Sequence, residues 1–313
     1  MVRKRIFIGA EVDGGMMRCA AIDCQTGKLL EDTVSMSEVD VHETAEVILE
    51  VWGGTLSRTL SGAGIDSPEG IGMAMPGPFD YENGIPLFTG QNNKYEQLYG
   101  INLPHELRML LGLASAVPVR FINNAAAFAL GEVLRGTARD TERSLSLTLG
   151  EGLGAAFIAD GLPVVRGDQV PRKGCLWHLP FGDGLADDYF SLRGLIRRYA
   201  RLRGRMLESA GELEQLARTD PVARAVFWDF GCRLVELLAP WLRRFQPEIL
   251  VVGGMLADYN ALFLPAMRLN LKKRVPGLQA EIGILKEKAA LTGSGRLLDP
   301  VFWDHVSPLL KEM

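Results

Sequence analysis

The sequence has few cysteines, no excess of positive charge and no long apolar run. Its four cysteines, Cys19, Cys24, Cys175 and Cys232, show neither metal-ligand nor disulfide spacing, which favours reduced thiols in a cytoplasmic protein. Lysine and arginine total 34 against 38 aspartates and glutamates, a formal net charge of −4, so the balance gives no support to nucleic-acid binding. The apolar runs are too short to cross a membrane. We therefore expect neither a nucleic-acid nor a membrane partner.

The order of the expected elements repeats along the chain. Residues 5–30 predict strand, glycine turn, strand, polar turn and strand, and residues 144–161 begin with the same order. Expected helices over residues 42–60, 103–111, 189–216 and 221–245 alternate with strands, which indicates an α/β fold. A chain of 313 residues is long for one core, and the repeat predicts two lobes of related topology.

Three glycine turns follow expected strands. Gly14 follows Glu11 in the first, residues 150–154 form the second, and Gly253 and Gly254 close the apolar strand at 249–252. Glycines let backbone N–H groups approach a phosphate, so each turn is a candidate nucleotide contact. Taken singly, each is also explained as a structural turn.

Two adjacent carboxamides, Asn123 and Asn124, stand where an apolar strand ends and an alanine-rich helix begins. Ligands collect at the carboxyl ends of strands in open α/β sheets, and helix N-termini favour polar or anionic partners. The simpler alternative is that Asn124 is only the N-cap of the helix, because Asn is among the preferred capping residues.

Five motifs occur along the chain: Pro76-Gly77-Pro78, Asn123 to Glu132, Gly150-x-Gly-Leu-Gly154, Gln246 to Gly254 and Ala290-x-x-Gly293. In their order and spacing they resemble the ROK family of sugar kinases and repressors, within the actin/hexokinase superfamily. The resemblance runs from about Ile6 to Leu298. It implies two RNase-H-like α/β lobes around a central cleft that holds ATP and a sugar. We expect the N-terminal lobe over residues 1–120, joined by the C-terminal helix at about 298–313, and the C-terminal lobe over residues 121–297.

The resemblance implies ATP-dependent phosphorylation of a hexose or N-acetylhexosamine hydroxyl, with Mg²⁺ shielding the triphosphate, in a homodimer. Repressors of the family carry a helix-turn-helix before the first strand. Here the strand begins at once, which favours a kinase. The implied substrate contacts are Asn123, His178, Asp187 and Gly77, and the implied nucleotide contacts are Glu11, Gly14, Gly150, Gly152, Gly154, Gly253 and Gly254.

The departures from the family pattern concern the chemistry itself. Asn124 stands where family kinases have the aspartate that accepts the proton of the attacking hydroxyl, and a carboxamide cannot accept it. Asp13 and Glu151 add carboxylates to the first two phosphate loops, and Cys175 replaces a sugar-binding glutamate. The zinc-binding cysteines are absent, so no zinc is expected. Two hypotheses stay open: a sugar kinase weakened by Asn124, and a non-catalytic pseudokinase that binds a sugar or sugar phosphate.

Overall fold

The computed structural model describes residues 5–90 and 94–313 and divides the chain into two compact units. The first runs to Leu134 and takes up Glu287–Met313, and the second is Arg135–Lys286. The C-terminal segment therefore joins the first unit, but the boundary expected between residues 120 and 121 falls inside that unit. The reason is strand pairing, because Val119–Asn123 pairs with Gly70–Met75 in the sheet of the first unit.

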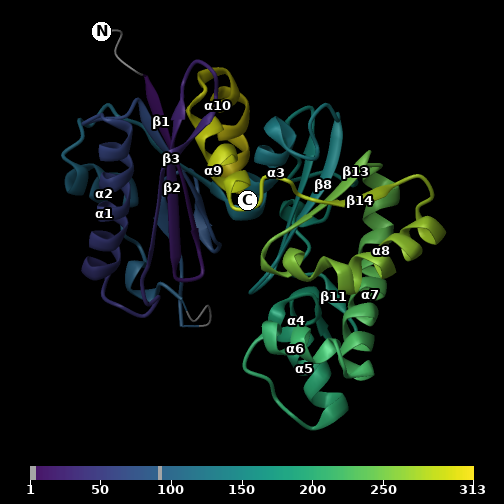
Figure 1. Ribbon diagram of the computed structural model, residues 1–313. Helices are drawn as coiled ribbons and strands as arrows, with labels where there is room; N and C mark the ends of the chain where they lie inside the picture. Colours follow the sequence, from purple (N-terminus) through teal and green to yellow (C-terminus); the bar gives the residue numbers. More distant parts are fainter. Residues whose placement is uncertain (1–4, 91–93) are drawn as a thin grey trace. The chain divides into compact units, whose positions relative to one another are not determined.

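The first unit is built on a five-stranded sheet in the order β3-β2-β1-β4-β7 (Figure 1). Strands β1, β2 and β3 form the antiparallel meander that the sequence predicts, and β4 and β7 run parallel to β1. The carboxyl ends of β1, β4 and β7 therefore lie at one edge of the sheet. The strands are β1 (Ile6–Asp13), β2 (Met16–Asp23), β3 (Leu29–Glu38), β4 (Gly70–Met75) and β7 (Val119–Asn123).

Helices cover both faces of this sheet (Figure 1). Helix α1 (Ala45–Ala63) begins where the Thr44 hydroxyl accepts a hydrogen bond from Val47 N–H, and it ends at Gly64 with φ 69°. Local caps of this kind explain why the sequence alone predicts such helices. The other helices of the unit are α2 (Leu103–Leu111), α3 (Asn124–Arg135), α9 (Lys288–Gly295) and α10 (Pro300–Val306).

Helix α9 packs against its neighbours backbone to backbone. A methyl group on Gly9 of β1 would overlap the Leu291 carbonyl oxygen, and one on Gly131 of α3 would overlap that of Ala289. Conversely, a methyl on Gly293 would overlap the Ala127 carbonyl oxygen of α3. Only glycine permits this close approach. Helix α9, near the C-terminus, therefore packs on β1 and α3 through glycines of its own and of its partners.

The substitution Gly293→Ala is expected to lower the free energy of unfolding by at least about 3 kcal/mol, because backbone rather than a flexible side chain must move. Gly54→Ala is the matched control on helix α1, where the nearest atom to an added methyl is the Arg58 guanidinium at 3.8 Å. There we expect stabilisation by about 0.5–1 kcal/mol, the difference in helix propensity. Urea unfolding of both variants measures the two effects, and equal midpoints would contradict the packing of α9.

The second unit repeats the sheet of the first, with the order β10-β9-β8-β13-β14 (Figure 1). Strands β8, β9 and β10 are antiparallel, and β13 and β14 run parallel to β8. Two sheets with one strand order confirm the prediction of two related lobes. The strands are β8 (Arg143–Leu149), β9 (Leu153–Ala159), β10 (Leu162–Pro163), β13 (Ile249–Gly253) and β14 (Gln279–Ile282).

The helical part of the second unit differs from the expectation in one stretch. Residues 189–216 form two helices instead of one, because α5 ends at Gly204 with φ 68° and α6 starts from a Ser209 cap. Tyr189 is the last residue of the short helix α4. Residues 168–188 contain a short hairpin of β11 (Pro180–Phe181) and β12 (Gly184–Leu185). The helices are α4 (Ala186–Tyr189), α5 (Leu192–Arg203), α6 (Ala210–Ala217), α7 (Pro221–Phe245) and α8 (Asn260–Arg274).

Within residues 5–90 and 94–313, no helix combines the length and the apolar character needed to cross a membrane.

Candidate active site

The candidate site of the first unit lies at the carboxyl edge of its sheet. Glu11 at the end of β1 pairs in register with Ala74 of β4, and Met75 pairs with Asn123 of β7. The turn after β4 carries Gly77, and Asn124 opens helix α3. Glu11, Gly77, Asn123 and Asn124 therefore lie along one edge of this sheet.

The side chain of Asn124 is anchored to the first phosphate loop. Its Nδ2 donates a hydrogen bond to the carbonyl oxygen of Val12 at 2.8 Å, which fixes the orientation of the amide because only the amino group can donate. Its Oδ1 is buried and has no hydrogen-bond partner among the described residues. A buried acceptor without a partner is costly, so this atom is suited to receive a ligand's hydrogen-bond donor.

The neighbouring Asn123, not Asn124, caps helix α3. Its Oδ1 accepts from Ala125 N–H at 3.0 Å, and its Nδ2 donates to the Tyr81 hydroxyl at 3.0 Å. Tyr81 in turn donates to the Met75 carbonyl oxygen at 3.1 Å, and its hydroxyl lies 3.6 Å from where a methyl on Gly77 would stand. The simple capping alternative for Asn124 is therefore wrong, and Tyr81 is a site residue that no sequence pattern indicated.

Glu11 is a largely buried carboxyl group, with 14% of its side chain exposed and Arg18 at 4.0 Å. Burial raises its pKa to about 8, and the charge of Asp13 adds to the shift, while Arg18 opposes it. Glu287, just before helix α9, raises the pKa further. At neutral pH the group is therefore mainly protonated, which reduces the repulsion that a carboxylate here would exert on a phosphate.

The glycine turn after β1 is held by a tyrosine. The Tyr95 hydroxyl donates to the Gly14 carbonyl oxygen at 2.6 Å, and its ring packs edge-on against Trp52. Gly14 has φ 57°, and apart from its two chain neighbours no atom of the described residues lies within 4 Å of where a methyl would stand on it. The turn is thus fixed, and one side of its backbone is open to a ligand.

In the second unit the two predicted glycine turns meet at the ends of β8 and β13. Gly254 has φ 81°, and a methyl on it would overlap Leu149 backbone atoms, with the carbonyl oxygen 2.5 Å away. From the other side, a methyl on Gly150 would lie 3.9 Å from the Met255 nitrogen. Residues 150–154 and 253–254 therefore form one glycine-lined surface, and its conformation at Gly254 needs glycine.

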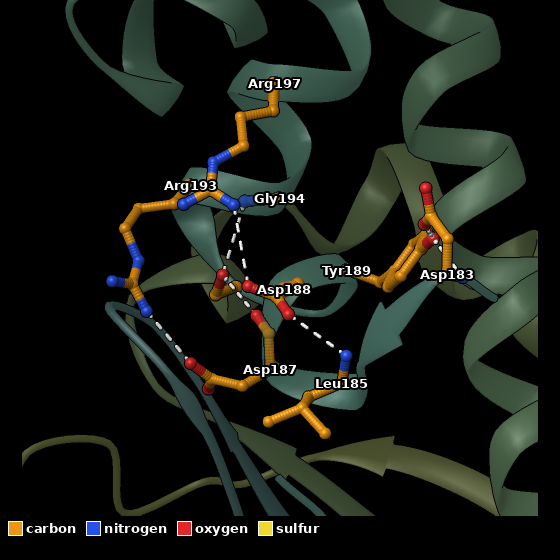
Figure 2. Close-up of polar contacts among 9 residues, drawn as sticks. Asp183, Leu185, Asp187, Asp188, Tyr189, Arg193, Gly194 and Arg197 are labelled. Atoms are coloured by element: carbon orange, nitrogen blue, oxygen red, sulfur yellow. Dashed lines mark hydrogen bonds and ion pairs between the residues drawn. The ribbon is translucent and has the colours of Figure 1, made fainter. Parts of the chain in front are cut away.

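Asp187 belongs to the same surface, because its carboxylate contacts the second glycine turn. Its Oδ1 accepts from Leu153 N–H at 2.7 Å, and its Oδ2 pairs with the Arg193 guanidinium at 2.9 Å (Figure 2). Its backbone N–H donates to the Trp177 carbonyl oxygen at 3.1 Å, which connects the turn to the segment that carries His178. Both carboxylate oxygens are thus used within the protein.

His178 is partly buried beside a thiol. Its Nδ1 lies 3.5 Å from Cys175 Sγ, and its ring meets Trp177 edge-on. Burial lowers the pKa of His178, and the positive charges of Arg172 and Lys173 lower it further. Burial also raises the pKa of Cys175. Both groups are therefore neutral at pH 7, so the pair forms a polar surface and not a thiolate nucleophile.

The hairpin of β11 and β12 directly precedes helix α4 and is held by side-chain contacts. The Tyr189 hydroxyl donates to the Asp183 carboxylate, and Asp183 N–H donates back to that hydroxyl at 3.1 Å (Figure 2). Arg233 lies over the rings of Phe181 and Tyr189, 5.0 and 4.7 Å from their centroids. Aromatic, cationic and hydrogen-bonding contacts therefore hold this hairpin. The described residues contain no group of three His, Cys, Asp or Glu arranged to hold a metal ion.

The ROK family model matches residues 8–294, and the chain belongs to the ROK family, which includes both sugar kinases and transcriptional repressors. The chain is 26% identical to an N-acetylgalactosamine kinase from Shewanella sp. (strain ANA-3), over 61% of this chain and 65% of that kinase. It is 28% identical to the glucokinase of Thermotoga maritima, over 84% of this chain and 86% of the glucokinase.

Solved structures share the fold. A ROK family glucokinase from Streptomyces griseus, in complex with glucose and AMPPNP, superposes with a TM-score of 0.72 at 23% identity. The match covers 93% of this chain and 98% of that chain. The two-lobed, hexokinase-type α/β fold is therefore established, and the family-level class is a carbohydrate kinase-like protein.

Proposed function

We propose that this protein phosphorylates a hydroxyl group of a hexose or N-acetylhexosamine with ATP, at a rate reduced by Asn124. The observation that carries the proposal is the buried Oδ1 of Asn124, which has no hydrogen-bond partner among the described residues while Nδ2 is anchored on Val12. A sugar hydroxyl is the donor that this acceptor suits. The kinase relatives supply the reaction class.

The glycine turns fit a nucleotide. The left-handed Gly14 has open space beside it, and the turns at Gly150 and Gly254 contact each other through backbone. Gly14, Gly150, Gly152, Gly154, Gly253 and Gly254 would hold the phosphates of ATP, which supplies the transferred phosphoryl group, with Mg²⁺ to shield its charge.

In the proposed reaction the sugar hydroxyl oxygen attacks the γ-phosphorus. A new P–O bond forms, the bond to the bridging oxygen breaks, and ADP leaves. Asn124 orients the hydroxyl by accepting its hydrogen bond but cannot remove its proton, so the proton passes to water or to a phosphate oxygen. Loss of a general base costs about 10²–10⁴-fold. Positioning and charge neutralisation provide most of phosphoryl-transfer catalysis, so turnover persists.

The alternative is a pseudokinase that binds a sugar or a sugar phosphate without turnover. The observation that favours it is that Asn123, the predicted sugar ligand beside the missing base, directs its Oδ1 and Nδ2 to Ala125 and Tyr81. The added carboxylates of Asp13 and Glu151 also favour the alternative, because their negative charges repel a triphosphate.

The experiment that decides between them is an assay of ADP release with glucose, mannose, N-acetylglucosamine and N-acetylgalactosamine. It is accompanied by transfer of labelled γ-phosphate to the sugar. We expect slow, sugar-dependent turnover that Asn123→Ala abolishes, with folding of the variant verified by circular dichroism. Calorimetry with AMPPNP and each sugar completes the test. Sugar binding without nucleotide binding or transfer would refute the kinase and establish the alternative.

A further inference from the structure

The carboxylate of Asp187 joins two elements that a family kinase would use for different substrates. The family aligns this position with a sugar contact, whereas here Oδ1 accepts the N–H of Leu153, which follows Gly152 in the glycine turn at 150–154. The other oxygen, Oδ2, pairs with Arg193 on helix α5 (Figure 2). The side chain of Asp187 is 25% exposed, and that of Arg193 is 56% exposed.

The glycine turn is enclosed by the start of helix α5 and the Asp187 carboxylate. Leu192 N–H donates to the Gly150 carbonyl oxygen at 2.8 Å. A methyl on Gly152 would stand 3.0 Å from Asp187 Oδ1, tighter than an ordinary contact. The turn is therefore held by two hydrogen bonds, from Leu192 N–H to the Gly150 carbonyl oxygen and from Leu153 N–H to Asp187 Oδ1. A shift of the Asp187 carboxylate would break the second of these bonds.

The backbone of Asp187 is fixed separately from its carboxylate. The Ser191 hydroxyl donates to the Asp187 carbonyl oxygen at 2.7 Å and accepts from Gly194 N–H at 3.3 Å. Ser191 is fully buried. The orientation of the carboxylate about its own torsions depends on its two partners, and of these only Arg193 lies on an element other than the turn itself.

We propose that Arg193 is a positioning residue for the phosphate-binding turn. It orients the Asp187 carboxylate, which in turn holds residues 150–154 in place for the nucleotide. Asp187 thus serves the nucleotide side of the reaction and not the sugar. The functional half of this inference rests on the proposed kinase activity, but the structural half does not.

Helix α5 supplies a matched control. Arg197 lies one turn farther along the same helix, is 49% exposed and pairs with Asp188 Oδ1 at 3.5 Å (Figure 2). The other oxygen of Asp188 accepts from Leu185 N–H at 3.0 Å, in the hairpin and not in the glycine turn. Removing either arginine deletes one exposed ion pair, and only Arg193 acts on the turn.

The first measurement is amide hydrogen exchange of the full chain without ligands. In Arg193→Ala we expect amide exchange in residues 150–154, and at Leu153 above all, to accelerate by about tenfold. The reason is that the hydrogen bond from Leu153 N–H to the charged Asp187 carboxylate is weakened when Arg193 no longer orients that carboxylate. Arg197→Ala should match the wild type, and Gly152→Ala should reproduce the effect by displacing the carboxylate. Equal exchange in the two arginine variants would overturn the proposal.

The second measurement separates the two substrates. In Arg193→Ala we expect the KM for ATP, or the dissociation constant of AMPPNP, to rise by about threefold to tenfold. The KM or dissociation constant of the sugar should stay within about twofold, and Arg193→Lys should recover part of the loss. A rise confined to the sugar would overturn the proposal. If the protein binds no nucleotide, the kinase function fails, and hydrogen exchange alone decides the role of Arg193 in holding the turn.

Discussion

Asn124→Asp is expected to raise kcat for sugar phosphorylation by about 10²–10⁴-fold, because it restores a carboxylate that can accept the proton of the attacking hydroxyl. The geometry makes this gain depend on pH. The side chain of residue 124 faces the Val12 carbonyl oxygen, which Asn124 Nδ2 approaches to 2.8 Å. A carboxylate oxygen there meets another acceptor in a buried place, so the introduced carboxyl group is expected to have a raised pKa.

The pH profile tests that reasoning directly. In its protonated form the introduced carboxyl group can donate to Val12 but cannot act as a base, so kcat/KM of the variant should climb with pH to a plateau as the group ionises. The wild type, with a carboxamide at position 124, should lack this rise. Asn124→Ala serves as the control that removes the amide without adding a base. A correctly folded Asn124→Asp with wild-type rates throughout the pH range would show that the base is not what limits turnover.

Glu11→Gln is expected to stabilise the protein at alkaline pH. The pKa of Glu11 is raised from 4.5 to about 8, chiefly by burial. Between these values the unfolded chain releases a proton that the folded protein keeps. The folded state therefore binds more protons, and stability falls as pH rises through this window. The stability that the protein loses across this window because of Glu11 is on the order of 3–5 kcal/mol.

Chemical unfolding of wild type and variant at a series of pH values isolates this group. The difference in unfolding free energy between Glu11→Gln and the wild type should grow from about pH 5 to about pH 8 and then level off. Because the charge of Asp13 adds to the raised pKa of Glu11, Asp13→Asn should make the stability of the protein less dependent on pH in the same window. A difference that is independent of pH would mean that Glu11 does not carry a raised pKa.

The sequence predicted the elements whose signals are local. Helices α1, α2 and α7 appear within a few residues of their expected ranges, because caps, apolar spacing and glycine ends act over neighbouring residues. The buried strand β13 and its glycine turn appear as predicted for the same reason. The repeated order of strands and turns also sufficed to predict two sheets of one topology.

Long-range pairing was not predictable. Whether the strand at Val119–Asn123 closes the first sheet or opens the second depends on its neighbour β4, which no local pattern names. The split of roles between Asn123 and Asn124 depends on contacts with Tyr81 and Val12, far away in the chain. Likewise, no local pattern indicates that the Asp187 carboxylate accepts a hydrogen bond from Leu153 N–H.

The close packing of helix α9 on the glycines of β1 and α3 also has a consequence for folding during synthesis. Residues 135–286 form a continuous unit, whereas the first unit needs Glu287–Met313. Until that segment has left the ribosome, helix α9 is not available to pack on the glycines of β1 and α3. The sheet of the first unit, although synthesised first, therefore stays partly uncovered until the C-terminal segment is made, whereas all residues of the second unit are present earlier.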